Sequence, residues 1–252
     1  MANALNVACE AVKKGAERAL KYFSHNPEVF LKSDNTPFTV ADKETETTIK
    51  ETILQTFPDA HFVGEEFGGS FDSEDVWIID PIDGTKNFIR SLPFWSILVA
   101  HYKNGEITEG VSYTPLMKEL LYAEKGEGAY INEKKVSVSK TSNVTQAYIS
   151  YPAVPSHFPY PENVSRILVA AQCARGFGDA FAYHLVANGR IDINMEPDIK
   201  VWDIAPFRVI IDEAGGKITN LQGKPWTVKD TTVVATNGLL HEEVIEILNL
   251  KQ

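Results

Sequence analysis

The segment WIIDPIDGTKNF, residues 77–88, decides how the rest of the chain is interpreted. It opens as a strongly apolar strand of the buried type, which delivers Asp80 at its carboxyl end. Pro81 fixes the backbone, and Asp83 follows three residues after Asp80. Gly84 permits an unusual dihedral angle or a close backbone approach. Two carboxylates this close repel each other unless a cation lies between them, so the segment predicts a cation site at a strand end.

Taken alone, an Asp-Pro-x-Asp-Gly sequence is more often only a turn, in which the Asp side chains accept local hydrogen bonds. Other acidic positions are candidates for the same cation site. Glu65 and Glu66 follow a second strand, in VGEE, and Asp203 stands at a predicted helix start, where a lone Asp is more often a cap. Carboxylates, backbone carbonyls and water are ligands of hard cations, and no His/Cys cluster accompanies them, so Mg²⁺ or Mn²⁺ is favoured over Zn²⁺.

The first half of the chain combines two helical patterns with a run of strands. Apolar residues recur at helical spacing over 3–23. A second helix is expected over 41–57, because Thr39 or Asp42 can cap its start and Pro58 lies just past its end. Short strands are expected at 61–64 and 76–80. From residue 93 to residue 138, alternating segments separated by turn residues predict an antiparallel meander.

In the second half of the chain, predicted strands alternate with predicted helices. Such alternation argues for an α/β layer. The predicted helices are 162–171, 179–188, 203–214 and 238–249, and the predicted strands are 146–152, 172–177, 191–197, 217–221 and 231–237. The proline-rich loop at 151–162 separates the halves. We therefore expect two domains, residues 1–145 with the antiparallel sheet and residues 146–252 with the Trp-Asp motif.

The composition excludes several classes of protein. The chain has 252 residues, a net charge of −10 and two cysteines. It has no basic run of the kind that binds nucleic acid, no apolar run of membrane-spanning length and no disulfide framework. The first residues lack the pattern of a signal peptide, so a cytoplasmic protein is expected. If an acidic chain handles phosphate, a local positive centre must overcome its field, and a metal ion can supply it.

The motifs GEE, DPIDGTKNF, VWDIAP and DEAGG, in this order and spacing, resemble those of the inositol monophosphatase superfamily over residues 4–237. The resemblance implies an α/β (α+β) fold, a layered α-β-α-β-α sandwich with one sheet in each half. It also implies a Mg²⁺-dependent phosphatase that hydrolyses a small phosphate monoester by attack of metal-activated water. Family members are often inhibited by lithium and are usually homodimers.

The resemblance also assigns roles to individual residues. The implied metal ligands, for two or three Mg²⁺ ions or Mn²⁺, are Glu65, Asp80, Asp83, Asp203 and the main-chain carbonyl of Ile82. Thr85 and Glu65 match the pair that orients the attacking water, and the amides of Gly84 and Thr85 match phosphate donors. Asp42 corresponds to an acidic catalytic position near a third metal, and Lys32 to a basic substrate-binding position on the flanking loop.

Two further positions bear on the substrate. Glu196 lies seven residues before Asp203 and matches a position that faces the leaving alcohol. Asp179, in RGFGD, stands where inositol phosphatases usually have a small or hydroxyl residue, and the segment is similar to the bacterial histidinol-phosphatase branch. A carboxylate there favours a cationic alcohol such as histidinol. Asp179 is also well placed to cap the following helix.

The expected substrate is therefore L-histidinol phosphate, which would place the protein in histidine biosynthesis. The segment VSYTPLMKELLYAEKGEGAYIN (111–132) is more typical of general inositol monophosphatases, so inositol-1-phosphate or another sugar phosphate is the alternative. A third possibility is a regulatory or binding protein that keeps the fold without turnover.

Overall fold

The computed structural model describes residues 3–23, 29–31, 37–151 and 161–250. The helices are α1 (Ala4–Leu20), α2 (Val40–Leu54), α3 (Thr85–Ile89), α4 (Pro161–Ala170), α5 (Asp179–Ala187), α6 (Val201–Glu213) and α7 (His241–Leu248), with a 3₁₀ turn at Val144–Gln146. The strands of the first half are β1 (Val29–Leu31), β2 (Pro37–Thr39), β3 (His61–Gly64), β4 (Gly68–Gly69), β5 (Asp75–Asp83), β6 (Ser96–Lys103), β7 (Glu106–Thr114), β8 (Glu119–Glu124), β9 (Gly128–Ile131) and β10 (Lys134–Val136). Those of the second half are β11 (Tyr148–Ser150), β12 (Cys173–Arg175), β13 (Ile193–Glu196), β14 (Lys217–Thr219) and β15 (Val233–Thr236).

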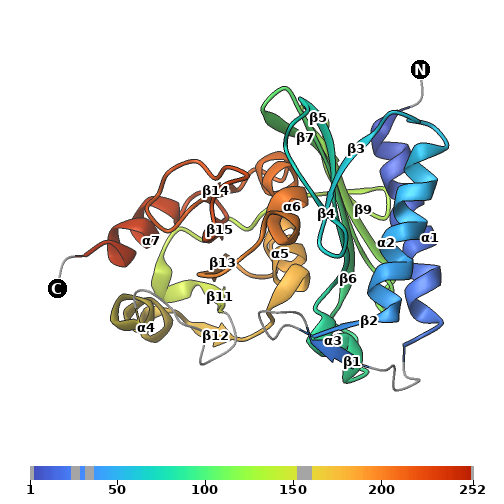
Figure 1. The fold of residues 1–252 in the computed structure, drawn as a ribbon. Helices are drawn as coiled ribbons and strands as arrows, with labels where there is room; N and C mark the ends of the chain where they lie inside the picture. The colour runs from blue at the N-terminus through green and yellow to red at the C-terminus, as the bar shows by residue number, and fades with distance from the viewer. Residues whose placement is uncertain (1–2, 24–28, 32–36, 152–160, 251–252) are drawn as a thin grey trace.

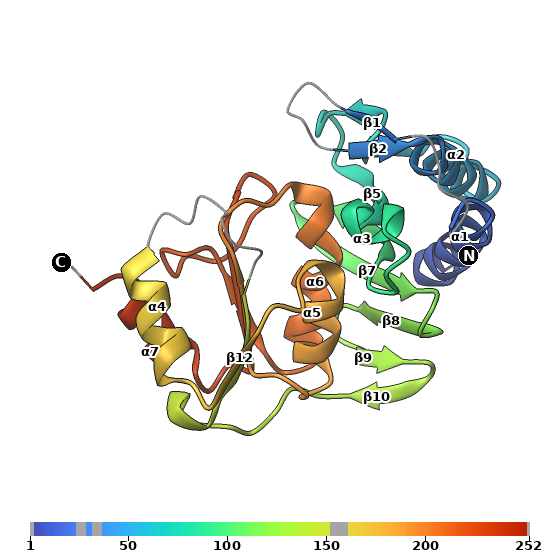
Figure 2. The same cartoon turned by 90° about the horizontal axis from the view of Figure 1, so that it is seen from below.

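These elements stack in five layers, which Figures 1 and 2 show from two directions. Helices α1 and α2 cover one face of an eight-stranded sheet with the order β10-β9-β8-β7-β6-β5-β3-β4. Helices α5 and α6 lie between this sheet and a five-stranded sheet with the order β12-β11-β13-β15-β14, and α4 and α7 cover the outer face of the second sheet. The predicted α-β-α-β-α sandwich is confirmed.

Each layer is held to the next by a buried apolar cluster. One cluster joins α1 and α2 to the large sheet, a second surrounds α5 and α6, and a third lies between the small sheet and α4 with α7. Helices α1 and α2 approach closely, since a Cβ added to Gly15 would lie 2.9 Å from Cγ1 of Ile49. The helical periodicity that predicted α1 therefore marks the face that the helix buries.

The predicted meander is confirmed, because β6 to β10 pair in sequence and antiparallel. Strand β5 is central in the large sheet, antiparallel to β6 on one side and parallel to β3 on the other. Parallel pairing brings the carboxyl ends of β3 and β5 to the same edge of the sheet. The GEE and DPIDG motifs, which lie at these two ends, are therefore neighbours in space.

Among the described residues, no helix combines the length and the apolar character that a bilayer-spanning segment requires.

A buried histidine ties α7 to the small sheet. His241 is 1% exposed, and its ring nitrogens lie 3.0 Å from the hydroxyl oxygens of Thr219 and Thr236. The Thr219 hydroxyl donates to the carbonyl of Asn220, so it accepts a hydrogen bond from Nε2–H of the histidine. The Thr236 hydroxyl then donates to Nδ1. This arrangement satisfies the neutral ring and leaves no acceptor ready for a second ring proton.

The protein is therefore expected to lose stability in mild acid through His241. Burial, together with the nearby Lys217 ammonium, lowers the pKa of His241 to about 4, whereas an unfolded histidine has a pKa of about 6.5. Because the unfolded chain takes up the proton first, this contribution is complete above about pH 6.5 and is lost as the pH falls towards about 4. Urea unfolding of the wild type and of His241→Gln should show their stability difference shrinking on acidification. A difference that stays constant over this range would contradict the assignment.

Candidate functional site

Nine of the predicted site residues line one cavity of about 170 Å³ at the carboxyl ends of β3 and β5. They come from both halves of the chain, so the cavity lies where the large sheet meets the layer of α5 and α6. The predicted residues are Glu65, Asp80, Ile82, Asp83, Gly84, Thr85, Asp179, Glu196 and Asp203, and they are joined by Tyr183 and Asp198.

A β-bulge turns Asp80 and Asp83 towards the same side. Side chains alternate along a regular strand, so residues three apart face opposite ways. Here Asp80 pairs with Leu98 whereas Asp83 pairs with Ser96, so β5 carries one extra residue between the two pairs. Because of the extra residue, the side chains of Asp80 and Asp83 point to the same side of the sheet. Pro81 is tolerated in the bulge because it has no amide hydrogen to donate to the sheet.

The three aspartates form a compact cage. One carboxylate oxygen from each of Asp80, Asp83 and Asp203 lies within 4.8 Å of the others. Each carboxylate is also oriented by a backbone amide: Ile82 N–H donates to Asp80 Oδ1 (3.0 Å), Ala180 N–H to Asp83 Oδ2 (2.6 Å) and Lys200 N–H to Asp203 Oδ2 (2.7 Å). A carboxylate held through one oxygen can present its other oxygen to a cation.

Crowding and burial raise the pKa of every aspartate in this cage. Burial is the main cause for Asp80, followed by the charges of Glu65 and Asp83. Burial is also the main cause for Asp83, followed by Asp179 and Asp203. It raises the pKa of Asp203 to about 7, against the opposing effect of the Lys200 amide. A divalent cation would reverse these shifts, because an opposite charge favours the ionised form.

Glu65 enters the cavity from the turn after β3. Its amide donates to the carbonyl of Ile79 on β5 at 3.2 Å, and the next amide, of Glu66, donates to Oε2 of the buried Glu46 at 2.8 Å. A Cβ on Gly64 would lie 2.1 Å from Oε1 of Glu46, so glycine is required where β3 passes this carboxylate. The glycine of the VGEE motif is thus explained by the packing that positions Glu65, whereas the contact of Glu66 uses its backbone amide and does not require a glutamate.

Gly84 and Thr85 occupy the turn between β5 and α3. Gly84 has a φ of 83°, and a Cβ there would lie 2.9 Å from the carbonyl oxygen of Phe94. Both expectations for this glycine, the unusual dihedral and the close approach, are confirmed. The Thr85 hydroxyl donates to the carbonyl of Ile82 at 3.0 Å. Because its only proton is committed there, the Thr85 oxygen can only accept a hydrogen bond from a further group.

Asp179 does not cap α5. Gly178 is the residue that precedes the helix, and no side-chain capping bond is formed. Asp179 instead has a left-handed φ of 49°, and its Oδ2 accepts a hydrogen bond from Asn87 Nδ2 at 2.8 Å. Of the two roles considered from the sequence, the cap is excluded, and the side chain faces the cavity beside Gly84, whose added Cβ would lie 3.3 Å from Asp179 Oδ2.

Glu196, at the end of β13, is held by two neutral donors. Tyr183 Oη donates to Glu196 Oε1 at 2.7 Å, and Asn194 Nδ2 donates to the same oxygen at 3.2 Å. Tyr183, Asn87 and Asp198 were not predicted from the sequence. Helical spacing could have identified Tyr183, which lies four residues after Asp179 and hence on the same face of α5.

Asp42 and Lys32 are the two remaining predicted positions. Asp42 is buried near the start of α2, where its Oδ2 accepts from the amide and the hydroxyl of Thr39 at 2.6 and 2.7 Å. It lies outside the cavity lining, although burial mainly, and the charges of Glu66 and Glu65 to a smaller extent, raise its pKa to about 7. Its catalytic role stays a prediction. Lys32 lies outside the described residues.

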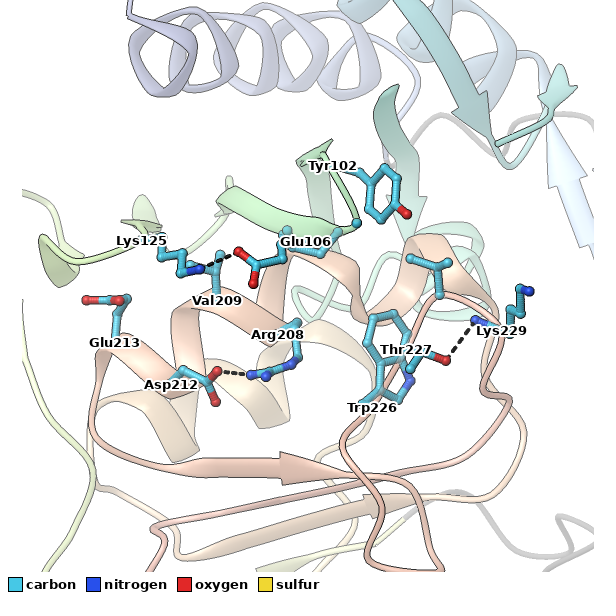
Figure 3. A pocket seen from close by; sticks show the side chains of 13 residues that line it. Tyr102, Glu106, Lys125, Arg208, Val209, Asp212, Glu213, Trp226, Thr227 and Lys229 are labelled. Carbon is cyan, nitrogen blue, oxygen red and sulfur yellow. Dashed lines mark hydrogen bonds and ion pairs between the residues drawn. The ribbon is translucent and has the colours of Figure 1, made fainter. Parts of the chain in front are cut away.

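A second cavity, of about 480 Å³, lies along the later turns of α6, and Figure 3 shows its lining. Lys125 pairs there with Glu106, and Arg208 pairs with Asp212. None of the predicted site residues that the structure describes lines this cavity. Lys125 and Arg208 are therefore neutralised by carboxylates, so this larger cavity is a poorer candidate for the active site.

The donor set of the first cavity fits a hard divalent cation. Among the eleven described residues that line it, seven carry a carboxyl group and none is lysine, arginine or histidine. Oxygen donors in this number are those that Mg²⁺ and Mn²⁺ select, whereas Zn²⁺ sites are built mainly from His and Cys. A cage of this charge density is costly without a cation and suits two divalent ions.

The chain is similar to known proteins over most of its length. The model of the inositol monophosphatase family matches residues 1–252. A histidinol-phosphatase of Mycobacterium tuberculosis is 37% identical over 227 residues, covering 86% of each chain. A fructose-1,6-bisphosphatase/inositol-1-monophosphatase of Thermotoga maritima is 35% identical over 221 residues, covering 84% of this chain and 82% of that protein. The solved structure of an IMPase of Thermotoga maritima superposes with a TM-score of 0.91 at 31% identity, covering 97% and 96% of the two chains.

Proposed function

Because the chain belongs to the inositol monophosphatase family of phosphatases, we propose that it is a Mg²⁺-dependent phosphate monoester hydrolase whose substrate is L-histidinol phosphate. The observation that carries this proposal is the cavity lining, which has seven carboxyl groups and no cationic side chain among its described residues. Such a lining repels a phosphate dianion until metal is bound. Once metal is bound, it attracts an alcohol that carries positive charge.

We assign the metal to Asp80, Asp83, Asp203, Glu65 and the carbonyl oxygen of Ile82. The assignment of the three aspartates as ligands is supported by the short distances between their carboxylate oxygens and by the raised pKa values of their carboxyl groups. When bound, Mg²⁺ supplies positive charge that neutralises the phosphate and acidifies a water molecule.

Thr85 and Glu65 orient the attacking water in this proposal. The Thr85 hydroxyl donates to Ile82, so its oxygen accepts one hydrogen of the water. The Glu65 carboxylate accepts the other hydrogen, which leaves a lone pair of the water oxygen directed at phosphorus. The water oxygen forms the new bond to phosphorus while the bond to the alcohol oxygen breaks. Glu65 takes up the proton that the water loses, and one proton is returned to the leaving alkoxide to give the alcohol. The products are inorganic phosphate and the free alcohol.

Gly84 and Thr85 bind the phosphate through their backbone amides. Both amides lie at the amino end of α3, where peptide dipoles favour an anion. Glycine is required at position 84 because a side chain there would collide with the carbonyl oxygen of Phe94 and crowd Asp179.

Asp179 and Glu196 recognise the alcohol. Both line the cavity, and both are held by neutral donors, so neither negative charge is cancelled by a direct ion pair in the described structure. Histidinol offers an ammonium and an imidazole, one for each carboxylate. A homodimer, as expected from the family resemblance, stays part of this proposal.

Replacing Asp179 by serine should separate the candidate substrates. The charge is removed, so kcat/KM for histidinol phosphate is expected to fall by at least about tenfold, the usual range for a charge-assisted hydrogen bond. The value for inositol-1-phosphate, which has no cation on its alcohol, should change less than about threefold. Asp179→Asn, which keeps the shape and the Asn87 contact, is the matched control for charge alone. An equal loss of kcat/KM for both substrates would show that Asp179 does not recognise the alcohol.

Inositol-1-phosphate, or another sugar phosphate, is the second candidate, favoured by the fructose-1,6-bisphosphatase/inositol-1-monophosphatase relative. Initial rates of phosphate release from both substrates in Mg²⁺ decide between them. We expect histidinol phosphate to be hydrolysed faster, and an equal or slower rate would overturn that substrate. Failure to hydrolyse a broad panel of monoesters would instead indicate the regulatory protein that keeps the fold without turnover.

A further inference from the structure

Tyr183 is the buried polar residue of the cavity to which no role has been given. It is 2% exposed, and it lines the cavity one helical turn beyond Asp179. Its ring stacks on Phe207 of α6 with centroids 4.6 Å apart and planes inclined by 18°. Its hydroxyl donates to Oε1 of Glu196 at 2.7 Å. The ring is thus fixed by α6 while the hydroxyl reaches a carboxylate on β13.

The contact determines which oxygen of Glu196 can meet a ligand. Tyr183 and Asn194 both donate to Oε1, at 2.7 and 3.2 Å. With Oε1 holding two donors, Oε2 is the oxygen that a ligand can engage. Two donors on one oxygen also fix the plane of the carboxylate, which would otherwise rotate about its last side-chain bond.

The first five residues of α5 link this contact to the rest of the cavity. Asp179 accepts from Asn87, the Ala180 amide donates to Asp83, and Tyr183 donates to Glu196. One short helix thus touches the alcohol-binding carboxylates and one carboxylate of the cage. A shift of α5 would move all three together, so this helix is suited to fix their spacing.

We propose that Tyr183 is a positioning residue that holds Glu196 in the orientation needed to contact the leaving alcohol of the substrate. The inference rests on the proposed function, because it assumes that Glu196 faces that alcohol. The competing explanation is that a buried tyrosine simply needs a hydrogen-bond acceptor and that Glu196 is the nearest one. In that case the hydroxyl would matter for stability and not for substrate selection.

Tyr183→Phe distinguishes these explanations, since it removes the hydroxyl and keeps the ring stacked on Phe207. With histidinol phosphate, KM should rise roughly tenfold, the effect of loosening one charged contact, while kcat changes less than about threefold because ground state and transition state lose the same interaction. With inositol-1-phosphate, both constants should change less than about threefold. Tyr113→Phe, on the opposite face of the large sheet, is the matched control and should leave both substrates unaffected.

A double-mutant cycle then tests whether the effect passes through Glu196. Tyr183→Phe should have no further effect on KM in the Glu196→Gln background, because the group that it positions is already altered. A purely structural role predicts instead that Tyr183→Phe lowers the melting temperature, changes KM no more for histidinol phosphate than for inositol-1-phosphate, and acts additively with Glu196→Gln. Additive effects, or no effect of Tyr183→Phe on either substrate, would overturn the inference.

The same measurements separate this inference from the proposed function. If the wild type prefers inositol-1-phosphate, the proposed substrate fails, yet the role of Tyr183 survives if its effect on KM for histidinol phosphate still requires Glu196. If histidinol phosphate is preferred and the effect of Tyr183→Phe is independent of Glu196, the positioning role fails and the substrate stands.

Discussion

Asp83→Asn is expected to lower kcat by roughly a thousandfold or more while the protein stays folded. Asp83 contributes one oxygen to the compact aspartate cage, and the loss of a charged metal ligand removes several kcal/mol of transition-state stabilisation. Each 1.36 kcal/mol corresponds to a factor of ten in rate, so about 4 kcal/mol gives a loss of this size. Asparagine keeps the shape of the side chain and can still accept from the Ala180 amide, which Asp83 does at 2.6 Å. Phosphate release in saturating Mg²⁺ measures the effect.

The same variant is expected to be more stable than the wild type when metal is absent. Burial, Asp179 and Asp203 all raise the pKa of the Asp83 carboxyl, which means that its charge is unfavourable in the empty cage. Removing that charge should raise the melting temperature in chelator by a few degrees, since about 1 kcal/mol corresponds to roughly 2–4 °C for a chain of this size.

The control is Asp59→Asn, which removes the same charge from an exposed turn. It should leave both kcat and the melting temperature close to those of the wild type. Near-normal turnover by folded Asp83→Asn would contradict the ligand assignment, whereas an inactive variant that is also unfolded would point to a structural role for this carboxylate.

Glu65→Gln is expected to have the second largest effect, a loss of about a hundredfold to ten-thousandfold in kcat, which is the usual contribution of a group that accepts a proton from the nucleophile. Glutamine keeps the length of the side chain but cannot take up that proton. The turn that carries it should be preserved, because the backbone amides of Glu65 and Glu66 donate to Ile79 and Glu46 whichever side chain follows. Single-turnover hydrolysis at saturating Mg²⁺ separates this chemical loss from weaker metal binding.

Glu66→Gln is the matched control, because it makes the same change one residue away and Glu66 does not line the cavity. Its activity should remain within about tenfold of the wild type. Equal losses in the two variants would show that the effect comes from the charge of the turn as a whole and not from a specific contact of Glu65 with water.

Much of the site was predictable from the sequence because its residues lie in short motifs whose residue types indicate their conformation and chemistry. Asp80 and Asp83 share one strand end, and Gly84 has the dihedral angle that its type suggested. What the motif could not reveal is why both aspartates face one cavity. That depends on the bulge in the pairing of β5 with β6, which is a property of the assembled sheet.

The contacts on the alcohol side depend on residues that are distant in sequence. Asp179 meets Asn87, 92 positions away, and only the placement of α5 beside α3 in the fold brings them together. The sequence left open whether Asp179 caps its helix, and the left-handed backbone of that residue excludes the cap. Helix and strand periodicity predicts which face is buried, but it does not predict the partner on a second element.

The central claim is that Glu65, Asp80, Asp83 and Asp203 together bind divalent cations. The most direct measurement is Mn²⁺ binding to metal-free protein, followed by the electron paramagnetic resonance signal of the free ion, for the wild type and for Asp80→Asn. The claim predicts that Mg²⁺ displaces Mn²⁺ bound to the wild type and that the variant loses at least one bound ion or binds it far more weakly. Equal binding by the two proteins, or no binding by the wild type, would contradict it.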